Sequence, residues 1–184
     1  ASHAEGSWTI ASGVDSHAEG SGTIASGYMS HTEGSGSVGV GYVSHAEGSG
    51  SIGIGAASHA EGRGTLAEGD WSHSEGFNTH SKGSSSHAEG NNTITTNEAE
   101  HAEGQFNKSN VRTRSSIGIG TSNTDRKNAV EVMTSGDMYV YGVGDYDGTN
   151  ATSSDSKTIQ DTINGLLATG GSMGSIIYNG STYE

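Results

Sequence analysis

Histidine and glutamate recur together along most of this 184-residue chain. A glutamate follows each of eight histidines after two residues, and successive pairs are 14 residues apart. The histidines are His3, His17, His31, His45, His59, His73, His87 and His101, and the glutamates are Glu5, Glu19, Glu33, Glu47, Glu61, Glu75, Glu89 and Glu103. Imidazole and carboxylate groups are zinc ligands and also transfer protons, so the pairs are candidates for metal binding or for acid–base catalysis.

A structural ladder explains the pattern better than either chemistry. Metal sites and catalytic sites are local and asymmetric, whereas these pairs return eight equal times, and no single serine stands out as a nucleophile. We expect each glutamate to accept a hydrogen bond from a histidine of its own chain or of a neighbouring chain. The sequence therefore predicts no catalytic residue, no metal and no cofactor, with a metal site and a repeated ligand-binding surface as alternatives.

Glycine spacing predicts the elements that carry the ladder. Glycines keep a seven-residue register from Gly6 to Gly90, and a helix would lose about 1 kcal/mol at each of them. Five residues ending in glycine, followed by a polar pair, instead predict a short strand and a tight turn in which glycine supplies the positive φ. Two strands make one coil of 14 residues, with histidine and glutamate on one face, and coils stack about 4.8 Å apart.

The composition predicts a thin solenoid. Only 29% of the residues are apolar and 31 are glycine, so the interior of a coil has room for alanine and glycine and for little else. The larger apolar residues of the second half-coil should therefore pack between chains of an oligomer. These residues are Ile10, Ile24, Val38, Val40, Ile52, Ile54 and Leu66.

The charge disfavours several classes of partner. The net charge is −13, and an acidic surface repels nucleic acid and anionic membranes. No apolar run approaches 18 residues, so we expect no membrane insertion. The basic residues Lys108, Arg112, Arg114, Arg126 and Lys127 are expected to form a collar that pairs with acidic groups of neighbouring chains.

Two short phrases carry a family resemblance. SVGVG at 37–41 and SIGIG at 51–55 resemble the head repeats of YadA-like trimeric adhesins, over roughly residues 1–120. The SHAEG phrase is similar to repeats in bacteriophage tail-fibre and receptor-binding proteins, and residues 115–144 resemble the connector that follows them. The resemblance implies a left-handed parallel β-roll in a homotrimer. This chain departs from the adhesin motif because histidine and glutamate stand where the motif has two aliphatic residues.

We expect an all-β protein in four segments. A YadA-like β-roll head spans residues 1–106, and a β-rich neck spans 107–150, with strands at 129–133 and 138–143. A linker and a short helix, which forms a trimeric coiled coil, span 151–171, because apolar residues there recur at helical spacing. Residues 172–184 are expected to form a C-terminal strand.

The turns are where the coils differ from one another. The residue pairs after glycine place Tyr28, Met29, Tyr42 and Trp71 along one edge and Phe77 along the other. Aromatic residues at turns can anchor a sugar or a protein partner, so these five are candidate receptor contacts. The alternative is that they fill the seam between chains.

Together these features favour a non-enzymatic homotrimeric fibre protein that attaches to a cell surface through a polysaccharide or protein receptor. The resemblance favours a bacteriophage tail fibre, located on the virion tail. The alternatives are a bacterial adhesin head, located outside the cell or on its surface, and a spacer rod that binds nothing.

Overall fold

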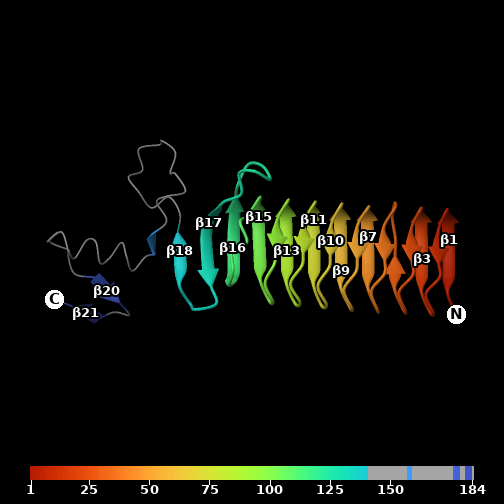
Figure 1. Ribbon diagram of the computed structural model, residues 1–184, viewed down its shortest axis with the longest axis horizontal. Coiled ribbons are helices and arrows are strands. Elements are labelled where there is room, and N and C mark those ends of the chain that lie inside the picture. Colours follow the sequence, from red (N-terminus) through yellow and green to blue (C-terminus); the bar gives the residue numbers. More distant parts are fainter. Residues whose placement is uncertain (141–156, 159–175, 179–180, 184) are drawn as a thin grey trace.

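The chain forms a long stack of strands that lie across the axis of a rod (Figure 1). The computed structural model describes residues 1–140, 157–158, 176–178 and 181–183. All secondary structure in these residues is β, and the strands of the repeats run parallel, in agreement with the predicted all-β solenoid.

The first half of each coil contributes one strand to a long sheet. These strands are β1 His3–Ser7, β3 His17–Ser21, β5 His31–Thr32, β7 His45–Ser49, β9 His59–Arg63, β11 His73–Phe77, β13 His87–Asn91 and β15 His101–Gln105. Each residue pairs with the residue 14 positions later, as in His3 with His17. The predicted period is therefore the sheet register.

The second half of each coil contributes a much shorter strand to a seven-stranded sheet. These strands are β2 Ile10–Ala11, β4 Ile24–Ala25, β6 Val38–Gly39, β8 Ile52–Gly53, β10 Leu66–Ala67, β12 His80–Ser81 and β14 Ile94–Thr95. Two strands per coil agree with the prediction, but the second strand has two residues instead of the five expected.

Glycine is required in the turns for two different reasons, backbone conformation and space. Gly20 and its equivalents have positive φ, as predicted, with 106° at Gly20 itself. At the other edge the prediction was wrong, because the left-handed residue is the second one after glycine, such as Val43 at 56° and Trp71 at 55°. Gly55 is needed there for space, since an added Cβ would lie 2.0 Å from the carbonyl oxygen of Gly69 in the next coil.

The interior of the stack is narrow and rich in hydroxyl groups. Ala18, Ala46 and Ala60 are fully buried, as predicted from the small residues of the repeat. Serine and threonine fill most of the remaining interior positions, and their hydroxyls find partners there, such as Thr65 Oγ1 donating to Ser51 Oγ at 3.0 Å. Many of these hydroxyls bond to a carbonyl or a hydroxyl within reach, which offsets the cost of burying them, whereas those of Thr32, Ser44, Ser58 and Ser72 have no partner.

The larger apolar residues of the second sheet point outward. Ile10 is 52% exposed, Val40 50% and Ile54 45%, while Ile24 and Ile52 are half-buried. This placement agrees with the expectation that they find no room inside a coil.

The long sheet continues beyond the repeats. β16 Thr113–Ile119 pairs parallel with β15, and β17 Asn128–Met133 and β18 Met138–Val140 follow as antiparallel strands. The strands expected from residues 129 and 138 are therefore present, the second as far as it is described. β19 Lys157–Thr158 pairs with β18, and β20 Ile176–Tyr178 forms a hairpin with β21 Ser181–Tyr183.

Several predictions for the C-terminal third differ from the structure or lie outside the described residues. Most of the expected helix at 151–171 lies outside the described residues, and Lys157–Thr158 is a strand. The expected single strand at 172–184 is a hairpin within the chain. The described residues contain no helix that could span a membrane.

Two residues of the expected basic collar have partners in their own chain, and pairing with neighbouring chains stays a prediction. Arg126 Nη1 donates to the carbonyl oxygen of Asn92 at 2.7 Å, and Arg114 Nη1 donates to that of Ala99 at 3.2 Å. The two arginines lie beside the last turns of the stack, where carbonyl groups of their own chain are within reach. They therefore fasten the end of the solenoid.

Candidate functional site

Parallel in-register pairing stacks the histidines into a column along the first sheet. From His31 to His87 the ring centroids of neighbouring histidines lie 4.6–4.7 Å apart, with interplanar angles of 5–6°. Because side chains alternate along a strand, the glutamates form a second column on the same face.

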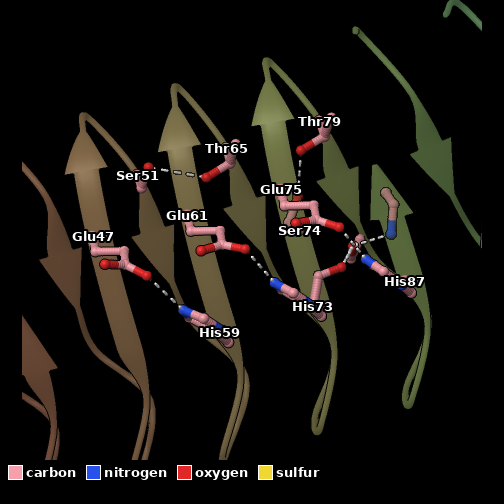
Figure 2. Close-up of polar contacts among 12 residues, drawn as sticks. Glu47, Ser51, His59, Glu61, Thr65, His73, Ser74, Glu75, Thr79 and His87 are labelled. Atoms are coloured by element: carbon pink, nitrogen blue, oxygen red, sulfur yellow. Dashed lines mark hydrogen bonds and ion pairs between the residues drawn. The ribbon is translucent and has the colours of Figure 1, made fainter. Parts of the chain in front are cut away.

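Each histidine of the later coils bonds to the glutamate of the preceding coil (Figure 2). The Nε2–Oε1 distance is 3.3 Å for His59–Glu47 and for His73–Glu61, and 3.2 Å for His87–Glu75. His101–Glu89 repeats the contact at 3.3 Å. The structure therefore builds the expected ladder within one chain, with side chains that are about one-third exposed.

The ladder ends at Glu103 because the 14-residue repeat ends there. In the next strand Ser115 pairs with His101, and Ile117 pairs with Glu103. Glu103 consequently has no histidine of a following coil above it.

Burial favours the neutral form of several histidines in the ladder. Desolvation, followed by the charge of neighbouring histidines, lowers the pKa of His73 and of His87. A protonated column would hold like charges at the ring spacing of about 4.7 Å.

The glutamate column shares protons. A hydrogen bond with Glu61, reinforced by desolvation, raises the pKa of Glu75 to about 7. The same hydrogen bond lowers the pKa of Glu61. One proton held between two stacked carboxyl groups explains both directions.

The first three coils do not complete the ladder. The Nε2 atoms of His17 and His31 are buried and have no hydrogen-bond partner. Beside them, Glu5, Glu19 and Glu33 line a hollow of about 470 Å³. Identical sequence phrases therefore give different geometry here.

His80 forms a further rung on the second sheet. Its Nε2 lies 2.7 Å from Glu68 Oε2 of the preceding coil, and its burial lowers the pKa of its imidazole. Sequence analysis did not assign this pair, although its 12-residue separation is the one that joins the other bonded pairs.

The variable turns form a rigid edge. Val43 N donates to Tyr28 O at 2.8 Å, and Trp71 N donates to Ala56 O at 2.8 Å, so successive turns are hydrogen-bonded like strands. The rings of Tyr28 and Tyr42 stack with centroids 5.1 Å apart. All four predicted residues of this edge are exposed: Tyr28 by 43%, Met29 by 49%, Tyr42 by 58% and Trp71 by 66%.

Phe77 lies apart from this group, at the opposite end of the first-sheet strand. The guanidinium of Arg63 lies over its ring in a cation–π contact, with Cζ 5.5 Å from the ring centroid. Phe77 therefore has a partner in its own chain, whereas Trp71 and Tyr42 offer broad exposed surfaces.

The arrangement can exchange protons, hold cations between carboxylates and present aromatic surfaces at a regular spacing. Comparison with known protein families finds none whose profile matches this chain, and comparison with characterised proteins finds no match. Function is therefore argued from the geometry.

Proposed function

We propose that this protein is a non-enzymatic homotrimeric fibre protein that attaches to a host cell surface, as a bacteriophage tail fibre or receptor-binding appendage. One observation carries the proposal. The frame of the rod keeps one 14-residue register, while the exposed turns along one edge vary from coil to coil and bear large aromatic residues. A surface that varies on a constant frame is suited to recognition.

Rigidity of the edge supports a binding role. Met29 N donates to Val14 O at 2.8 Å, and Ala57 N donates to Tyr42 O at 2.7 Å, so each turn is held by its neighbours. A prearranged surface loses little conformational entropy on binding. Tyrosine and tryptophan offer large contact areas for a polysaccharide or a protein receptor.

The outward apolar residues of the second sheet support association of three chains. Ile24, Val38, Ile52 and Leu66 follow one another at successive coils and remain half-buried in a single chain. A coil whose interior holds only small side chains gains little hydrophobic stabilisation by itself. Three rolls side by side, with the left-handed sense of YadA-like heads, would cover this stripe.

The proposal places the protein on a virion tail or on another extracellular surface. The acidic surface is compatible with a dispersed particle and unfavourable for nucleic acid. The fibre acts without a cofactor and without inserting into a membrane.

Binding of the labelled, cross-linked oligomer to whole bacterial cells, bacterial surface polysaccharides and animal matrix proteins tests this function. We expect selective binding to some bacterial strains. The double variant Tyr42→Ser, Trp71→Ser should lose that binding, while Trp8→Ser should keep it, because Trp8 is 88% exposed and also has positive φ but lies on the other edge.

Other results would replace the proposal. Binding to matrix proteins or to animal cells would favour a bacterial adhesin. Absence of binding to every surface would favour a spacer rod.

A further inference from the structure

The second and third coils bring histidine and glutamate together without bonding them to each other. In later coils the His–Glu distances are 3.2–3.3 Å, whereas His45 Nε2 lies 3.9 Å from Glu33. The buried Nε2 of His31 has no hydrogen-bond partner and, unlike that of His73, forms no ion pair with a glutamate. A polar nitrogen in this position lacks the stabilisation that the other rungs provide.

Thr32 gives these coils a different interior from the others. The equivalent position is alanine or serine in every other coil, while Thr32 is fully buried and its Oγ1 has no partner. Gly39 lies opposite, where an added Cβ would come within 2.9 Å of Thr32 Cγ2. Strand β5 ends at Thr32 and is the shortest of the first-sheet strands of the repeats, although Glu33 N still donates to Ala46 O of the next coil at 3.0 Å.

Three side chains near the end of β5 lie close together. Glu19, His31 and Glu33 each offer one ligand atom, and these atoms lie within 4.8 Å of one another. The two carboxyl groups also belong to the hollow lined by Glu5.

We propose that Glu19, His31 and Glu33 bind a divalent transition-metal ion, with Zn²⁺ as the expected ion. One imidazole nitrogen and two carboxylate oxygens are suitable zinc ligands, with bonds of about 2.0–2.2 Å. Mg²⁺ and Ca²⁺ prefer oxygen ligands and gain nothing from the imidazole.

Three other groups hold ligand atoms equally close, but each of them contains a histidine that is already paired with a glutamate of the same group. They are His3, Glu5 and His17; His45, Glu47 and His59; and His73, Glu75 and His87. In each of them one histidine bonds to the glutamate at 3.2–3.3 Å. A metal ion would have to break that bond, so the group of Glu19, His31 and Glu33 is the preferred site among the residues that the structure describes.

Zinc binding to the whole protein tests the proposal. Calorimetry at pH 7.5, with metal analysis after gel filtration, should give one Zn²⁺ per chain and a higher melting temperature with zinc. His31→Asn and Glu33→Gln should each weaken binding by about tenfold or more, since even indirect partners of a metal typically contribute that much. His59→Asn, the same change at a bonded rung, should leave binding unchanged.

Two further measurements separate direct ligation from a change in fold. In a Cu²⁺-loaded sample, electron paramagnetic resonance should show coupling to one imidazole nitrogen, and His31→Asn should remove it. Thr32→Ala should weaken zinc binding without altering a ligand, because it restores the interior of the other coils. Absence of zinc binding, or equal binding by the His31 and His59 variants, would overturn the proposal.

Discussion

His73, in the middle of the ladder, contacts three neighbouring side chains. His73 stacks on His59 and His87 with centroid distances of 4.7 and 4.6 Å, and its Nε2 meets Glu61 at 3.3 Å. Glu89 adds a further negative charge nearby. Even so, desolvation and the histidine charges lower the pKa of His73, so the ladder favours neutral imidazoles.

Acidification should loosen this part of the rod. A histidine whose pKa is lower in the folded state than the unfolded value of about 6.5 binds fewer protons when folded, so its stabilising contribution falls as the pH drops through that value. The melting temperature should therefore fall between pH 7.5 and pH 4.5. His73→Asn should melt below the wild type at pH 7.5, and this difference should shrink by pH 4.5, as measured by circular dichroism. A constant difference across this range would contradict the prediction.

Glu75 should show the opposite pH dependence. Its pKa of about 7 lies above the usual carboxyl value, so ionisation destabilises the folded state at higher pH, and this cost is relieved as the pH falls toward 4.5. Glu75→Gln should therefore be more stable than the wild type at pH 8, by about 1 kcal/mol or less because solvent screens the carboxyl. The gain should disappear near pH 4.5 in denaturant titrations. Glu47→Gln serves as the control at an equivalent rung, and an equal gain in both variants would refute this account of Glu75.

At the level of the elements, glycine decides how closely two coils approach. The column that contains Gly41, Gly55 and Gly69 is buried, and a Cβ at each would overlap the backbone of the next coil. Asn97 takes this place in the last full coil, where no further repeat follows. Its backbone N–H and its side chain both donate to the buried Glu100, which closes the stack.

Two glycine variants should separate close approach from backbone conformation. Gly55→Ala should destabilise the solenoid by about 3 kcal/mol, because its Cβ meets backbone that cannot yield. Gly50→Asn should cost well under about 1 kcal/mol, since Gly50 has φ of 67° with open space beside it, and Asn78 and Asn92 occupy the same place in later coils. Chemical denaturation of both variants measures the difference. Equal destabilisation would show that close approach is not what requires Gly55.

The repeat period predicted the elements because a 14-residue register fixes which residues pair. It could not predict which turn residue takes the left-handed conformation, since Val43 and Trp71 do so despite side chains that disfavour it. The histidine and glutamate columns were also predictable from alternation along the strand. Their separation into bonded rungs and an open group was not, because identical phrases, SHAEG at 16–20 and at 58–62, give both geometries.

At the level of the whole molecule, stability depends on what covers the second sheet. The interior of a coil supplies alanine, serine and threonine, while the apolar surface lies outside. The second sheet therefore presents an uncovered apolar surface. The proposal assigns a second and a third chain to cover it.

A charge in the outward stripe should separate the chains. Ile52→Asp should convert the assembly to single chains, because burying an isoleucine contributes about 1.5–3 kcal/mol and burying an unpaired carboxylate costs more. Val14→Asp should leave the assembly intact, since Val14 lies at a turn and is 63% exposed. Sedimentation velocity distinguishes the species. If both variants assemble like the wild type, the stripe is not the interface.

The mass of the wild-type protein in solution is the most direct test of the account. Light scattering coupled to gel filtration at pH 7.5 should give the mass of three 18.6 kDa chains, and dilution into the micromolar range should not change it. A mass of one chain, in a sample that melts cooperatively, would contradict the account, because a single solenoid would then be stable with its apolar stripe exposed.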